Sequence, residues 1–147
     1  MIWENGFPTT AAYFSRAKGI SDATAALKLA TDTIQQPAGS TIYFAVDFDA
    51  KEAEVSGPVT DYFQGVKSVF DVVAVSYEIG VYGSGATCQA LLDQGLATFT
   101  WLSQSTGFRG TRTFANFNIK QGKETTICGM DADEDEADVA ACGGFTV

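Results

Sequence analysis

Hydrophobic and polar side chains alternate most strictly in the segment TIYFAVDFDA, residues 41–50. Successive side chains of a β-strand point to opposite faces, so this pattern predicts a strand over residues 41–49. One face would be apolar and comprises Ile42, Phe44, Val46 and Phe48. The other would carry two acids and comprises Tyr43, Ala45, Asp47 and Asp49. The pattern indicates a strand that packs on helices and turns its acids towards a polar cavity, or an edge strand whose polar face meets water.

Strand-like and helix-like segments alternate along the rest of the chain. The other expected strands are residues 1–5, 78–83, 97–105, 117–122 and 129–134. The expected helices are residues 21–36, 59–73 and 86–95. This order predicts parallel strands joined by right-handed helical crossovers, which is an α/β architecture. A chain of 147 residues without a recognisable linker is expected to form one domain over residues 1–147.

Polar side chains gather where these strands end. In parallel α/β sheets, ligands bind at the carboxyl ends of the strands. The residues at these ends are Glu4, Asp47, Asp49, Tyr82, Ser84, Trp101, Ser103, Gln104, Gln121, Asp131 and Asp133. We interpret this set as a functional cleft, although strand ends also meet loops and some polar residues would be found there in any case.

Composition excludes several classes of function. The formal net charge is −9 with nine Lys and Arg, so nucleic acid and anionic membrane surfaces are not expected partners. The chain has no histidine, which excludes Ser-His-Asp and Cys-His catalysis and histidine-bound zinc. Acid/base chemistry must then use carboxylates, tyrosines or lysines. The first residues, MIWENGFPTT, show no export signal, which is either absent or already removed.

Cysteine spacing and the acidic segment DADEDE leave two alternatives open. Cys128 and Cys142 could form a disulfide, or these two and Cys88 could remain thiols. Asp131, Asp133 and Asp135 have a spacing that suggests a cation site. However, Glu136 occupies the glycine position of a calcium-binding EF-hand loop, and Cys142 occupies that of its closing glutamate. No metal or cofactor is therefore expected.

Five motifs in this order resemble one family: IYFAVDFDA, IGVYGSGATC, TWLSQSTGF, IKQG and GMDADE. They are similar to the domain-of-unknown-function 1906 family, the glycoside-hydrolase-like proteins of the Rv2525c type, which resemble the family 25 muramidases in turn. The resemblance implies a TIM-barrel-like (β/α) fold with an acidic cleft at the strand ends. The first two strands of the family would precede residue 1. An incomplete barrel of about six parallel strands is therefore expected, open on one side or closed by a second copy or partner chain.

The resemblance also implies roles for the acids. Asp47 and Asp49 match an Asp-x-Glu pair, Asp131 matches a late aspartate, and Glu4 matches an acid on the third strand of the family. Asp49, one methylene shorter than the family's glutamate, would be the general acid, and Asp47 or Asp131 would orient water or stabilise the transition state.

The ligand implied is a glycan. Tyr82 and Trp101 would stack on sugar rings unless they pack in the core. Gln104, Gln121 and Ser84 would form hydrogen bonds with the sugar, unless the two glutamines bond to other groups inside the barrel. The implied function is hydrolysis of cell-wall or related polysaccharide. The alternative is a glycan-binding or structural module without turnover. Either function indicates an extracellular, cell-envelope or phage-particle location.

Overall fold

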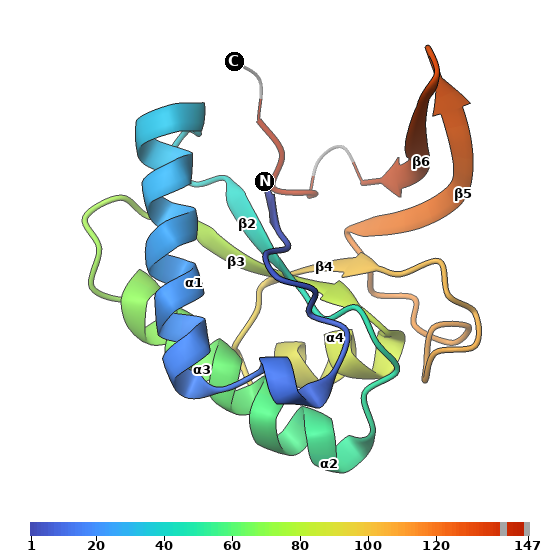
Figure 1. The fold of residues 1–147 in the computed structure, drawn as a ribbon, viewed down its shortest axis with the longest axis horizontal. Coiled ribbons are helices and arrows are strands. Elements are labelled where there is room, and N and C mark those ends of the chain that lie inside the picture. The colour runs from blue at the N-terminus through green and yellow to red at the C-terminus, as the bar shows by residue number, and fades with distance from the viewer. Residues whose placement is uncertain (139–140, 146–147) are drawn as a thin grey trace.

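The computed structural model describes residues 1–138 and 141–145, and its centre is one six-stranded sheet in the order β1-β2-β3-β4-β5-β6 (Figure 1). The strands are β1 Ile2–Trp3, β2 Thr41–Ala45, β3 Glu78–Gly83, β4 Phe99–Leu102, β5 Ile119–Ile127 and β6 Met130–Ala137. The first five are parallel, whereas β6 is antiparallel to β5. Each strand lies beside its neighbour in the sequence, as in a barrel. The sheet forms a half-barrel, which confirms the expected incomplete α/β barrel.

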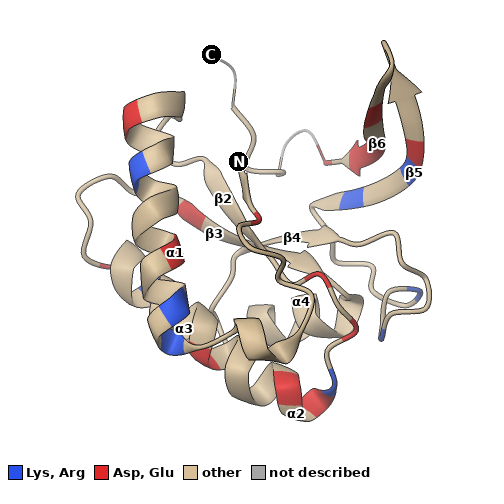
Figure 2. Cartoon of the chain, in the orientation of Figure 1, with Lys and Arg blue, Asp and Glu red and all other residues tan. Residues whose placement is uncertain are grey.

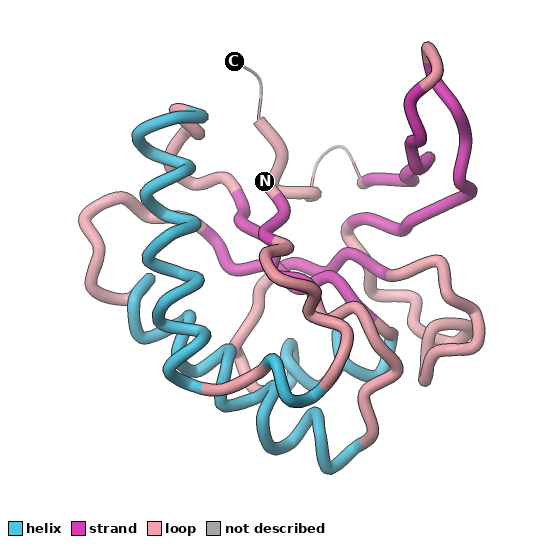
Figure 3. The backbone as a smooth tube through the Cα atoms, in the orientation of Figure 1, coloured by secondary structure: helices cyan, strands magenta, loops and turns pink. Residues whose placement is uncertain are grey.

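Helices cover one face of this sheet, while the β5–β6 hairpin projects away from the helices (Figure 3). Residues 141–145 lie towards the other face, where the Cys142 carbonyl contacts Tyr43. The helical segments are η1 Ala11–Tyr13, α1 Arg16–Lys28, η2 Leu29–Ile34, α2 Glu52–Glu54, η3 Val55–Val59, α3 Thr60–Phe70 and α4 Gly85–Asp93. The first long helix begins earlier than predicted because Ser15, not Ser21, caps it by accepting a hydrogen bond from the Lys18 amide. In the described part of the chain, no helix has the length and apolar character needed to cross a bilayer.

The core lies between the sheet and the helices. Ile42, Phe44 and Val46 are fully buried there, so the predicted apolar face of β2 is confirmed. Helices α1 and α3 approach closely because Gly19 and Gly65 lie at their crossing. A Cβ atom on Gly19 would overlap the Tyr62 carbonyl, and one on Gly65 would overlap the Arg16 carbonyl.

The sixth strand corrects the prediction of a fully parallel sheet. Cys128 and Gly129 form a two-residue turn with φ angles of 53° and 78°, which is the backbone that joins adjacent antiparallel strands. A parallel connection needs about a dozen residues or more, and the segment between β5 and β6 is far shorter. The chain therefore reverses, and β5 and β6 form a hairpin that projects from the sheet (Figure 1).

Strand β1 forms the opposite edge of the sheet. It pairs with β2 through Ile2↔Tyr43 and Trp3↔Phe44, and no other described strand pairs with it. The half-barrel is thus open along β1.

Candidate functional site

The face of the sheet opposite the helices, here called the concave face, is lined by aromatic side chains. The Trp101 ring meets the rings of Tyr43 and Tyr82 edge to face, at centroid distances of 5.7 and 5.9 Å. Tyr43 can lie over β3 because its neighbour there is Gly80, where a Cβ atom would overlap the tyrosine ring. These three aromatic residues lie outside the apolar core beneath the helices.

Hydrogen bonds join this aromatic group to the hairpin. The Gln121 Oε1 atom accepts hydrogen bonds from the Tyr82 hydroxyl at 2.9 Å and from the Gln104 amide at 3.2 Å. Gln121 Nε2 donates to Asp133 at 2.7 Å, and Trp101 Nε1 donates to Asp135 at 3.0 Å. Gln121 therefore connects the ends of β3 and β4 to an acidic wall formed by β6.

A second acidic wall lies beyond the ends of β1 and β2. Glu4 follows β1, and Asp47 follows β2, where its backbone amide donates to the Pro8 carbonyl at 3.0 Å. Partial burial raises the pKa of Glu4, and the nearby charge of Asp47 raises it further. Glu4 is thus biased towards its protonated form beside a second carboxyl group.

Tyr82 lies between the two walls. Burial is the main cause of its raised pKa, and the negative charges of Asp47, Glu4 and Asp133 raise it further. Figure 2 shows acidic positions on β6 and in the loop after β2. The sequence predicted one cleft around Glu4, Asp47, Asp49, Tyr82 and Asp131. Of these, Glu4, Asp47 and Tyr82 lie near enough for the two acids to act on the tyrosine.

Asp49 is placed differently from the prediction. Strand β2 ends at Ala45, and Asp49 turns towards the loop between β4 and β5. Its carboxylate accepts a hydrogen bond from the Arg109 amide at 2.7 Å and pairs with Arg109 Nη1 at 3.1 Å. Arg109 Nη1 also donates to the Asp49 carbonyl at 3.0 Å. Asp49 therefore anchors this loop through Arg109.

Two further predicted site residues lie elsewhere. Asp131 pairs with Thr126 beside the hairpin turn, because β6 runs in the opposite direction to the prediction. Ser84 is fully buried, and its hydroxyl caps α4 by accepting a hydrogen bond from the Thr87 amide at 3.1 Å. Ser84 therefore stabilises a helix terminus and is not exposed to a ligand.

Cysteines and acids do not form a metal centre or a crosslink in the described residues. Cys88 is buried, Cys128 lies in the hairpin turn, and the Cys142 carbonyl accepts a hydrogen bond from the Tyr43 hydroxyl at 2.7 Å. All three are free thiols, so the alternative of a Cys128–Cys142 disulfide is not realised. Within residues 1–138 and 141–145, no three His, Cys, Asp or Glu side chains are grouped to hold a metal ion.

Comparison with known families agrees with this fold. Residues 1–138 match the family described as "Rv2525c-like, glycoside hydrolase-like domain". The chain belongs to this family.

Relatives of this Rv2525c-like domain occur in Bacillus subtilis strain 168. The uncharacterized protein YbfG is 41% identical over 124 residues, which are 78% of this chain and 17% of YbfG. The uncharacterized protein FadG is 33% identical over 100 residues, which are 67% of this chain and 17% of FadG. This chain therefore spans about 17% of the length of either relative.

Solved structures of similar fold come from Mycobacterium tuberculosis. The Tat-secreted protein Rv2525c in complex with L-tartrate matches with a TM-score of 0.75 and 17% identity. A second crystal form, in complex with HEPES, gives a TM-score of 0.73 and 17% identity. Each match covers 88% of this chain and 61% of the Rv2525c chain. At this identity the likeness concerns the fold.

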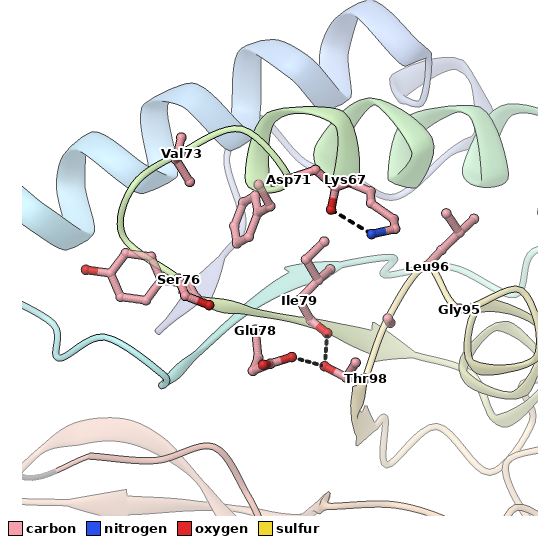
Figure 4. A pocket seen from close by; sticks show the side chains of 12 residues that line it. Lys67, Asp71, Val73, Ser76, Glu78, Ile79, Gly95, Leu96 and Thr98 are labelled. Carbon is pink, nitrogen blue, oxygen red and sulfur yellow. Dashed lines mark hydrogen bonds and ion pairs between the residues drawn. The ribbon is translucent and has the colours of Figure 1, made fainter.

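Another cavity, of about 360 Å³, lies at the amino ends of β3 and β4 of this Rv2525c-like domain, away from the two acidic walls (Figure 4). Its polar groups bind one another: Lys67 pairs with Asp71 at 2.7 Å, and the Thr98 hydroxyl donates to Glu78 at 2.9 Å. These internal pairs leave few polar groups for a ligand, so the concave face is the better candidate site.

Two features of the concave face were missed from the sequence. Asp133 contacts Gln121 and Asp135 contacts Trp101, whereas the sequence assigned the site role to Asp131, named Asp133 only as a strand-end residue and considered Asp135 only for a cation site. The Cys-Gly pair at residues 128–129 could have predicted these contacts, because it forms a two-residue hairpin turn that reverses the direction of the strand. The need for glycine at position 80 could not be predicted from the sequence, because it depends on the ring of Tyr43 from another strand.

Proposed function

We propose that this domain binds a polysaccharide along the concave face and hydrolyses a glycosidic bond there, with Glu4 as the proton donor. The observation that supports this proposal is the raised pKa of Glu4 beside Asp47. Glycosidases commonly use one protonated and one ionised carboxyl group, and neighbouring environments separate the two pKa values. Membership of a glycoside-hydrolase-like family points to the same chemistry.

The proposed roles follow from the positions of the side chains. Glu4 donates its proton to the leaving-group oxygen, while Asp47 remains ionised and stabilises the positive charge that develops on the sugar. The rings of Tyr82 and Trp101 offer apolar surface to a sugar, and their polar atoms are already fixed by Gln121 and Asp135. Fixed rings lose little conformational freedom when a ligand binds.

A second candidate function is glycan binding without turnover. Asp49 and Asp131 are two of the acids that the muramidase resemblance would use, yet Asp49 is bound to Arg109 and Asp131 lies beside the hairpin turn. This alternative keeps the aromatic face and the hydrogen-bonding role of Gln121, and it assigns no proton transfer to Glu4.

Wild-type protein and the Asp49→Asn variant, tested with peptidoglycan and chitin-like oligomers, distinguish these functions. We expect both proteins to bind and to release reducing ends, because Asp49 anchors a loop through an exposed pair that contributes at most about 1 kcal/mol. Binding without release supports the module. If the wild-type protein shows no binding and no release, both functions are contradicted. Release that Asp49→Asn abolishes restores Asp49 as the proton donor.

We also propose an extracellular or cell-envelope location. Such a location would bring the concave face to cell-wall polysaccharide. The structural neighbour Rv2525c is described as Tat-secreted, which supports the proposal by likeness of fold.

The open β1 edge leads us to propose that two copies associate there. Exposed backbone groups of an edge strand pair readily with another strand. Apolar side chains nearby are also exposed to solvent, Ile2 to 36% and Phe7 to 84% of its surface. We expect light scattering to give a dimer mass that Ile2→Lys reduces to that of a monomer. Ile20→Lys, at a similarly exposed position of 40% on α1, should leave the dimer intact. A wild-type monomer at high protein concentration would contradict this proposal.

A further inference from the structure

A cavity of about 360 Å³ lies at the carboxyl end of β4 and beside the first half of β5, between β5 and the loop that joins the two strands. Three basic residues line it, together with polar side chains of the loop and of β5. We call it the basic cavity, and the residues relevant here are Gln104, Thr106, Arg112, Lys120, Gln121 and Lys123.

The basic residues of this cavity have no acidic partners. No Asp or Glu lines the cavity, and the three ion pairs of the described chain involve Lys18, Lys67 and Arg109 instead. Three of only nine Lys and Arg thus gather without an ion pair in a chain of net charge −9. In so acidic a protein, unpaired cations around one cavity create a local positive potential that attracts an anion.

Local contacts orient two of these cations. Arg112 Nε donates to the Thr106 carbonyl at 3.0 Å, which fixes the guanidinium plane and leaves its terminal nitrogens for another acceptor. The Lys120 ammonium lies 5.5 Å from the centroid of the Phe117 ring. Glu136 stands opposite Lys120 in the β5–β6 register, where it reduces the positive potential without forming an ion pair.

Gln121 separates the basic cavity from the concave face. It lines the cavity, yet its side chain holds Tyr82 and Asp133 on the other side. A polymer bound over Tyr82 and Trp101 would therefore pass close to Gln104 and Gln121, with the three cations behind them.

We propose that the basic cavity binds a carboxylate or phosphate substituent of the saccharide that lies along the concave face. Charge-assisted hydrogen bonds from Arg112 and the two lysines would hold the anion. The inference rests on the proposed function for the saccharide, and it adds that the preferred glycan is anionic.

Binding of three matched ligands by titration calorimetry tests this inference: a chitin-like oligosaccharide, its carboxylated derivative and its phosphorylated derivative. We expect at least one charged derivative to bind roughly tenfold more tightly than the neutral oligomer, with an advantage that falls as salt is added. Lys120→Gln and Lys123→Gln should each reduce this advantage. Glu136→Gln should increase it, because the opposing charge is removed. Lys28→Gln, an exposed lysine on α1 with the same change of charge, should leave it unchanged.

The outcomes separate this inference from the proposed function. Equal affinity for neutral and charged oligomers contradicts anion binding in the basic cavity, while the proposal of glycan binding still stands. An equal loss in Lys28→Gln also overturns it, since the effect would then be one of net charge. Inorganic phosphate, titrated alone, provides the remaining comparison. If it binds through Lys120 and Lys123 while no oligosaccharide binds, the anion site is supported and the proposed function fails.

Discussion

Replacement of Glu4 by glutamine is expected to lower glycan hydrolysis by about 10²–10⁴-fold while glycan binding persists. Glutamine fills the same space but cannot deliver a proton to the leaving-group oxygen. Reducing-end release and binding affinity, measured on the same preparation, would show the two effects separately.

The pH dependence of hydrolysis gives an independent check on Glu4. Burial and the charge of Asp47 raise the pKa of Glu4 above 4.5, so its protonated fraction falls only as pH rises through that higher value. Activity should therefore fall on the alkaline side above pH 4.5. Asp47→Asn removes the charge that helps to raise the pKa of Glu4. The alkaline fall in any residual activity should therefore begin at a lower pH than in wild type.

Glu52→Gln serves as the matched control, because Glu52 is an exposed acid on α2 outside the concave face. Its rate should equal that of wild type. If Glu4→Gln retains wild-type turnover, Glu4 is not the proton donor and the acid must be sought among the other carboxyl groups of the concave face.

Gly19→Ala and Gly65→Ala should each destabilise the fold by roughly 2 kcal/mol or more. The added methyl group would overlap a backbone carbonyl of the facing helix, and a carbonyl cannot move aside as a flexible side chain can. Alanine is the better helix former by about 1 kcal/mol, so the observed loss is the overlap cost minus this gain. Urea unfolding monitored by circular dichroism measures the difference.

Gly107→Ala is the control for these variants. Gly107 lies in the β4–β5 loop, where an added Cβ atom meets nothing within 4 Å. Its unfolding free energy should stay within about 0.5 kcal/mol of wild type. A stabilised Gly19→Ala variant would mean that α1 and α3 can separate at no cost, contrary to the packing described.

Local patterns in the sequence determined the layers of this protein. Strict alternation in residues 41–46 separates Ile42, Phe44 and Val46, which face the helices, from Tyr43, which faces the concave side. This follows because the period of side-chain direction is a property of the strand itself. The polar residues at the strand ends were also predictable, since parallel strands bring their carboxyl ends to one edge of the sheet.

Only the tertiary structure decided which acids stand together. Alternation placed Asp49 beside Asp47, but β2 ends at Ala45, and Arg109, sixty residues away along the chain, holds the Asp49 carboxylate. The turn at residues 128–129 reverses β6, so Asp133 contacts Gln121 and Asp135 contacts Trp101, while Asp131 lies beside the turn.

The physical reason is the range of the interactions. The direction of a side chain depends on its own backbone and its immediate neighbours, which the sequence displays in order. The partner of a carboxylate at a strand end depends on where a distant loop or strand returns, and that is set by pairing and packing across the whole sheet. Residues 41–46 could therefore be assigned to their faces from sequence, whereas the environments of Glu4, Asp49 and Asp131 could not.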